Sequence, residues 1–195
     1  CNVHTVSEVI MQGKLYQINT RVLLTDLSRE LGSSATLNDI PDAMLDQWAA
    51  TGVNWIWMLG VWQTGQASRT VSLNHHAWQQ EYRDTLPDLR PEDIGGSMFA
   101  IQDYRVSATL GGEAALASLR SRLKDRGLRL MLDFVPNHMA LDHVWLSTEP
   151  DYFIQGNAEH LSTQPQNYCE LMIDGQKKIF AHGRDPYFPG WPDTV

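Results

Sequence analysis

The chain has 195 residues, of which 43% are hydrophobic and 19% are charged, so it can form a sizeable core and shows no sign of disorder. Its formal net charge of -8 argues against nucleic acid or an anionic membrane surface as the main partner. No apolar run approaches the ~20 residues that span a bilayer, so no membrane segment is expected.

The first fourteen residues have neither the basic nor the apolar segment of a secretion signal, and residues 1–14 are expected to form an N-terminal tail. The chain starts with Cys1, and Met11 is a candidate for the true start, which would make residues 1–10 extraneous. Cys169 is the only other cysteine, so a reducing, cytoplasmic setting is the default expectation.

Three apolar runs are predicted to be strands. They span residues 15–24, 53–62 and 128–135, and their apolar residues are nearly continuous rather than alternating. Continuous apolar runs are typical of strands that are covered on both faces, as in a parallel sheet.

Two amphipathic segments between these runs are predicted to be helices. The first has Asn38 as its expected N-cap and Pro41 in its opening turn, and it ends near Gly52. The second spans about residues 113–126 and ends at Gly127. The order strand, helix, strand, helix, strand predicts right-handed βαβ units and an α/β fold.

Two stretches exceed what a compact βα unit needs. Residues 63–112 far outrun the ~2 to 6 residues of a short βα loop, which indicates functional elaboration. Residues 139–195 are rich in aromatic residues, proline and glycine, and are expected to form an irregular subdomain. Three strands cannot close a barrel of about 250 residues. The sheet is therefore either open or part of a larger protein, and the loop-like end at Val195 favours a fragment.

The sharpest chemical signal is the run Asp133-Phe134-Val135-Pro136-Asn137-His138. It lies at the carboxyl end of a predicted strand, where α/β folds place their active sites. A carboxylate in an apolar strand needs a partner or a role, because burying an unpaired charge is costly. Asn137 offers an oxygen to a hard cation, and His138 can donate to a sugar hydroxyl. From spacing alone, a strand-end Asp with an incidental Asn-His pair is an equally good interpretation.

The resemblance to a known family separates these interpretations. Residues 126–138 closely resemble the third strand of glycoside hydrolase family 13, the α-amylase family, whose first signature is an Asp followed four and five residues later by Asn and His. Upstream, Asp103-Tyr104-Arg105-Val106, followed by Leu110-Gly111-Gly112, resembles the family's Asp-Tyr segment, and residues 16–24 and 55–62 resemble its first two strands. Four segments that resemble the family in the same order along the chain favour membership of this family.

The resemblance implies a fold and a substrate. Residues 15–138 would form the first three β/α units of a TIM barrel, and residues 139–195 would form a B-domain-like insertion after the third strand. The implied partner is an α-glucoside, oligosaccharide or polysaccharide. No dinucleotide, phosphate-loop or zinc spacing is present, so no organic cofactor is expected.

The resemblance also implies roles for residues in the signature run. His138 would hydrogen-bond the sugar in the subsite where cleavage occurs, and Asp133 would support that subsite. Asn137 lies at a position that often ligates a structural calcium ion, although one amide is far short of the six to eight oxygens that calcium takes.

Four further residues are substrate-binding candidates. Phe99 matches a stacking position that is commonly Tyr; it keeps the ring face and loses the hydroxyl, and core packing is the alternative. Tyr104 belongs to the Asp-Tyr segment. Arg184 and Asp185 lie in a polar, aromatic run of the kind that lines sugar subsites, unless they pair locally. For Trp62, His75, His76 and Trp78, a surface or core role is the favoured interpretation.

The family cleaves α-glucosidic bonds with retention, using two carboxylates about 5 Å apart. Its catalytic carboxylates come from the fourth, fifth and seventh strands, so no catalytic residue is assigned here, and Asp133 is not the nucleophile. The resemblance implies the N-terminal part of a hydrolase, transglycosidase or phosphorylase. A catalytically inactive binding or assembly subunit is the alternative. An independent small α/β domain would unfold cooperatively as a monomer, whereas we expect an aggregation-prone chain.

Overall fold

The computed structural model describes residues 13–185 and 187–195. Most of the predicted N-terminal tail, including Cys1 and the candidate start at Met11, lies outside the described residues. None of the described helices is long and apolar enough to cross a bilayer.

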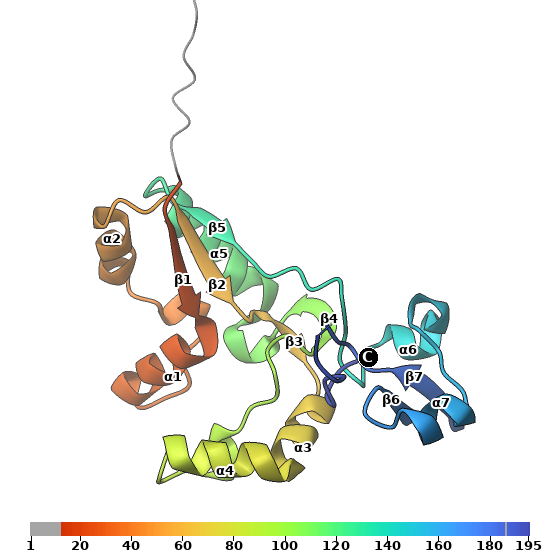
Figure 1. Ribbon diagram of the computed structural model, residues 1–195. Helices are drawn as coiled ribbons and strands as arrows, with labels where there is room; N and C mark the ends of the chain where they lie inside the picture. The colour runs from red at the N-terminus through yellow and green to blue at the C-terminus, as the bar shows by residue number, and fades with distance from the viewer. Residues whose placement is uncertain (1–12, 186) are drawn as a thin grey trace, which may run out of the picture.

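A parallel sheet forms the base of the fold (Figure 1). Its strands are β1 (Leu15–Asn19), β2 (Trp55–Leu59) and β5 (Arg129–Met131), in the order β1-β2-β5. Both pairings are parallel, and β5 pairs with β2 through only three residues. The predicted α/β class and the three successive parallel strands are therefore confirmed.

The first strand is shorter than predicted because a helix begins inside the apolar run. The side-chain oxygen of Asn19 accepts the backbone N–H of Val22 at 3.3 Å and so caps α1 (Thr20–Leu31). Gly32, with φ of 67°, ends this helix in the left-handed conformation that favours glycine. The polar cap at Asn19 thus starts a helix inside an apolar run predicted to be a strand throughout.

The next helices follow the prediction except at one cap. Thr36, not Asn38, caps the short 3-10 helix η1 (Leu37–Asp39) through a reciprocal pair with Asp39. The helix α2 (Asp42–Ala50) starts directly after Pro41, whose fixed φ suits a helix start. The second predicted helix is α5 (Gly112–Lys124).

The long stretch after β2 is more regular than the sequence indicated. Its elements are β3 (Trp62–Thr64), α3 (Gln66–Asn74), α4 (His76–Thr85), η2 (Pro91–Asp93), β4 (Ile101–Val106) and η3 (Ala108–Leu110). The predicted strand 53–62 is split at Gly60, whose φ is 78°, and β3 pairs antiparallel with β4 in a second, two-stranded sheet.

The C-terminal part is also more regular than expected. It contains α6 (Trp145–Thr148), η4 (Pro150–Tyr152), α7 (Ala158–Thr163), β6 (Tyr168–Ile173) and β7 (Gln176–Ala181). The last two strands form an antiparallel hairpin across Asp174 and Gly175, which both have positive φ. A two-residue turn with two positive φ values matches the right-handed twist of paired strands.

The hydrophobic residues gather in two clusters on either side of residue 138. The larger packs the sheet against α1, α2 and α5, with Leu45, Ile56 and Leu119 fully buried at its centre. The smaller is built around Phe180 in the C-terminal hairpin. The carboxyl end of β2 leads toward β3 in the middle of the molecule, and that of β1 leads into α1 (Figure 1).

Candidate functional site

Asp133 lies just beyond β5 and is anchored by the end of β2. Its Oδ1 accepts the indole N–H of Trp57 at 2.8 Å, and its Oδ2 accepts the backbone N–H of Gly60 at 2.6 Å. The side chain is only 7% exposed, so both donors satisfy a charge that would otherwise be costly to bury. Asp133 therefore fixes the end of the third strand to the second.

Two more aromatic side chains hold the backbone that follows Met131. Trp62 donates its indole N–H to the carbonyl of Asp133 at 2.9 Å. The hydroxyl of Tyr104 donates to the carbonyl of Val135 at 3.0 Å and accepts the N–H of Val135 at 2.9 Å. We call Trp57, Trp62 and Tyr104 the aromatic brace. It replaces strand pairing where β5 has ended, and so it positions the segment that carries His138.

His138 is half-buried and stands edge-on to Trp191, with ring centroids 4.8 Å apart. Burial lowers the pKa of His138 from its ordinary value, while the carboxylate of Asp193 and the backbone of Phe99 oppose part of that shift. The imidazole is therefore neutral at pH 7, a form in which one ring nitrogen donates a hydrogen bond and the other accepts one.

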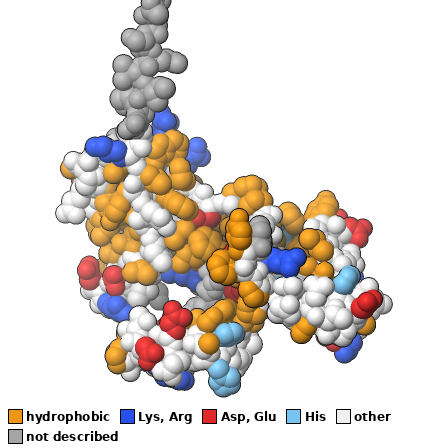
Figure 2. Space-filling model, in the orientation of Figure 1, with side chains coloured by type: hydrophobic (Ala, Val, Ile, Leu, Met, Phe, Trp, Pro, Cys, Tyr) orange, Lys and Arg blue, Asp and Glu red, His pale blue; other side chains and the backbone are white. Residues whose placement is uncertain are grey.

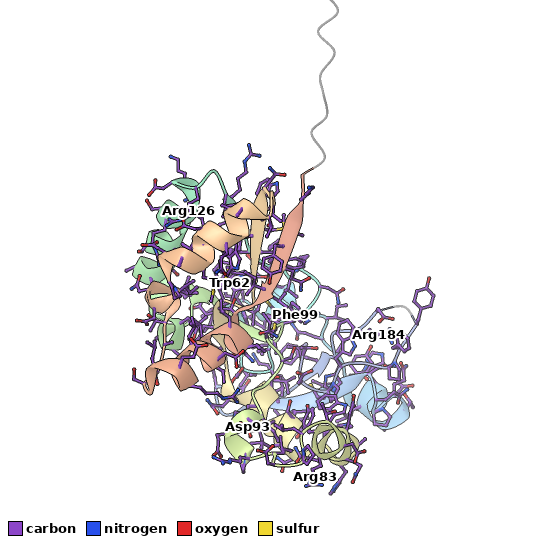
Figure 3. All side chains as sticks on the ribbon, turned by 90° about the vertical axis from the view of Figure 1, so that its left-hand side faces the viewer. Trp62, Arg83, Asp93, Phe99, Arg126 and Arg184 are labelled. Atoms are coloured by element: carbon purple, nitrogen blue, oxygen red, sulfur yellow. The ribbon has the colours of Figure 1, made fainter. Side chains whose placement is uncertain are left out.

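One cavity of about 630 Å³ opens beside His138. Phe99 lines it and is 37% exposed, so the predicted stacking ring is available on the cavity side rather than lost in the core. In Figure 3, Phe99 lies on the side of the strands that faces the C-terminal part, whereas Arg126 lies at the other end of the strands. The cavity is of a size that suits a small ligand.

A second cavity, of about 680 Å³, lies on the subdomain side of His138 and is lined by Asn137, His182 and Arg184. The side-chain amide of Asn137 donates to the backbone carbonyl of Arg184 at 3.3 Å, which ties the signature segment to the later loop. The guanidinium of Arg184 is exposed, so it is free to meet a ligand here.

Asp185 has a local structural role. Its Oδ1 accepts the backbone N–H groups of Tyr187 at 2.7 Å and Phe188 at 3.1 Å, which closes a turn. Among the described residues no ion pair joins it to Arg184, so the local pairing considered from the sequence is not formed.

The structure thus divides the predicted site residues. Phe99 and His138 share one cavity, while Asn137, His138 and Arg184 share the other. Tyr104 and Asp133 hold the backbone of the signature segment instead of exposing their polar groups to either cavity. Whether these positions contact a sugar stays a prediction.

From the sequence alone, several residues that line the first cavity have no assigned binding role. They are Trp78, for which a surface or core role is the favoured interpretation, and Glu81, Tyr82, Trp191 and Asp193. The first three had a readable signal, because their spacing of three and four residues puts them on one face of a helix. For Asp193 the sequence carries no such signal, because its hydrogen-bond partner Ser68 is distant in sequence.

The described residues contain no group of three or more His, Cys, Asp or Glu side chains that could hold a metal ion. Asn137 and the carbonyl of Arg184 supply too few oxygens for calcium, which takes six to eight. These residues alone therefore do not form a calcium site, and no step is assigned to a metal.

A family model described as the alpha amylase catalytic domain matches residues 43–186. Among curated proteins, the amino acid transporter heavy chain SLC3A1 of Rattus norvegicus is 28% identical over 118 residues, covering 55% of this chain and 16% of that protein. The Homo sapiens protein of the same name is 28% identical over 87 residues, covering 40% of this chain and 12% of that protein.

Solved structures show the same fold at low identity. The alpha-glucosyl transfer enzyme XgtA gives a TM-score of 0.55 at 19% identity, covering 91% of this chain and 30% of XgtA. The trehalose-6-phosphate hydrolase of Bacillus licheniformis gives 0.55 at 17% identity, covering 91% of this chain and 29% of the hydrolase. The isomaltulose synthase of Erwinia rhapontici, in complex with sucrose, gives 0.54 at 19% identity, covering 92% of this chain and 29% of the synthase. The chain thus spans under a third of each structure.

Proposed function

Because the chain belongs to the alpha-amylase family through a catalytic-domain match over residues 43–186, we propose that it forms part of the sugar-binding site of an enzyme that processes α-glucosides with retention. The observation that carries the proposal is the shared cavity of His138 and Phe99, which is lined by the segment that follows the carboxyl end of β5. That edge of the sheet is where enzymes with this architecture bind substrate.

In this proposal the described residues bind and orient the sugar. The neutral imidazole of His138 donates to a hydroxyl, and the exposed ring of Phe99 packs against the apolar face of the pyranose. The aromatic brace holds the backbone between Asp133 and Val135, so that His138 is presented without reorganisation. The bond-breaking carboxylates are assigned to residues outside this chain.

The experiment is to assay the full-length protein with maltose, sucrose and starch, and to follow the anomer first released by NMR. Release of the α-anomer is expected, because two successive inversions at one carbon retain its configuration. A first product of β configuration contradicts the retaining mechanism.

Binding separates the roles of the residues. His138→Ala is expected to weaken maltose binding about tenfold, the effect of losing one hydrogen bond to a sugar hydroxyl. The matched control is His76→Ala, which changes an exposed histidine at the start of α4. Equal losses in both variants would contradict a binding role for His138.

A non-catalytic role is the second candidate, and one observation favours it. The curated relatives are amino acid transporter heavy chains, which suggests a subunit that binds a transporter instead of processing a sugar. In that case the full-length protein turns over none of the three sugars and co-purifies with a membrane transporter. Turnover excludes this candidate.

Calcium binding at Asn137 and a cytoplasmic location also remain proposals. Calcium is tested by the change in melting temperature when EDTA is added to the full-length protein, with Asn137→Ala as the comparison. Cell fractionation tests the location. A melting temperature unchanged by EDTA, or recovery in a membrane or secreted fraction, contradicts the respective proposal.

A further inference from the structure

One face of α4 lines the cavity beside His138. Trp78, Glu81 and Tyr82 all border this cavity, and their spacing places them together on the helix surface. The ring of His75 stacks on Trp78 at 4.2 Å, and its Nδ1 accepts the backbone N–H of Trp78 at 3.4 Å. The helix start and the indole are therefore fixed together. We call Trp78, Glu81 and Tyr82 the α4 face.

A second carboxylate borders the same cavity from the C-terminal segment. Asp193 is only 5% exposed, and its Oδ2 accepts the hydroxyl of Ser68 at 2.7 Å. The oxygen of that hydroxyl accepts the backbone N–H of Ser97 at 2.8 Å. Asp193 is thus held in place by α3 and by the loop before β4, and its charge acts on His138.

The described residues that line this cavity include two carboxylates, Glu81 and Asp193, and no lysine or arginine. The nearby guanidinium groups of Arg21 and Arg69 line a different cavity, of about 450 Å³. Each guanidinium is held in that position by two hydrogen bonds. Arg21 donates to the carbonyl of Gly96 and the hydroxyl of Thr64, and Arg69 donates to the backbone carbonyls of Ile94 and Pro91.

We propose that the α4 face, with Asp193, is a charge filter that admits uncharged α-glucosides to the cavity beside His138 and excludes those that carry a carboxylate or phosphate. The aromatic rings of Trp78 and Tyr82 pack against the uncharged substituent, and Glu81 repels an anionic one across a cavity that holds no compensating cation. Glu81 is then a specificity-determining residue. This inference rests on the proposed sugar-binding function.

The filter is tested with two ligands of similar shape and different charge, 4-nitrophenyl α-D-glucoside and 4-carboxyphenyl α-D-glucoside. Dissociation constants are measured by calorimetry on the full-length protein at low salt. The neutral ligand is expected to bind more tightly to the unmodified protein. In Glu81→Gln the anionic ligand should gain about three- to tenfold in affinity, as expected for removing one like charge across a solvated cavity. In Glu81→Lys it should gain more.

The matched control is Asp84→Asn, which removes the same charge from the same helix. Asp84 does not line the cavity, and its Oδ1 accepts the side-chain amide of Gln80 at 2.8 Å. In this control the preference for the neutral ligand should stay unchanged. The side chain of Glu81 is exposed and makes no hydrogen bond or ion pair with another described residue, so its replacement should leave the fold intact.

Four outcomes overturn the inference. If the unmodified protein binds both ligands equally, or if Glu81→Gln changes neither affinity, the filter is absent while sugar binding stands. If Asp84→Asn restores anion binding as well as Glu81→Gln does, the effect comes from overall charge and not from the α4 face. If neither ligand binds and maltose does not bind either, both the proposed sugar-binding function and the charge filter are wrong.

Discussion

At the scale of single residues, the side chains in and around the signature segment fall into two groups: those that hold its backbone in place and those that line the cavities. The carboxylate of Asp133 is hydrogen-bonded to Trp57 and Gly60, and the hydroxyl of Tyr104 is hydrogen-bonded to Val135. His138 alone of the segment borders both cavities. The sequence and its family resemblance identified this histidine, but only the structure shows that Asp193 acts on its charge.

The first prediction concerns that charge. Burial lowers the pKa of His138, and Asp193 opposes the shift because a nearby carboxylate stabilises the imidazolium. Asp193→Asn removes that stabilisation, so the pKa of His138 should fall further below its ordinary value of 6.5. NMR titration of the full-length protein, labelled at histidine, measures both values. A pKa that rises in Asp193→Asn contradicts the assigned interaction.

At the scale of elements, the apolar pattern of the sequence predicted the three strands of the parallel sheet and two helices, because burial dictates those patterns. It failed where polar side chains set the boundary, as at Asn19, which starts a helix inside an apolar run. It also missed the C-terminal hairpin, although Asp174-Gly175 is a strong two-residue turn signal. The brace could not be foreseen, since its partners are distant in sequence.

The second prediction tests the brace. In the full-length protein, Tyr104→Phe leaves the N–H and carbonyl of Val135 without their partner, which should lower the free energy of unfolding by about 1 to 3 kcal/mol. Amide hydrogen exchange at residues 134–138 should increase and maltose affinity should fall, because His138 is held less firmly. Tyr187→Phe is the control, since Tyr187 is 87% exposed and lines neither cavity. Unchanged exchange in Tyr104→Phe would mean that the brace does not position the segment.

At the scale of the whole molecule, the parallel sheet is open at both edges among the described residues. Its outer strands β1 and β5 each have a single neighbour, and apolar side chains such as Phe134, 79% exposed, and Ile154, 74% exposed, face solvent. Figure 2 shows hydrophobic surface spread across the middle of the molecule. Open edges and apolar patches are sites of association.

The third prediction follows from these surfaces. The 195-residue chain, expressed by itself, should self-associate and lack a cooperative unfolding transition, because its exposed edges and apolar side chains find partners in other copies. Light scattering after size exclusion and urea denaturation measure both properties. A monomer with a sharp two-state transition would instead support an independent small α/β domain.

The hydrogen bonds that Trp57 and Trp62 make to Asp133 give the protein a built-in optical reporter. Both indole N–H groups are engaged with one aspartate, and the segment that follows it carries His138. Any ligand that shifts this segment changes the electric field on two fixed chromophores. Intrinsic fluorescence and near-ultraviolet circular dichroism are therefore expected to report any shift of this segment without an attached label.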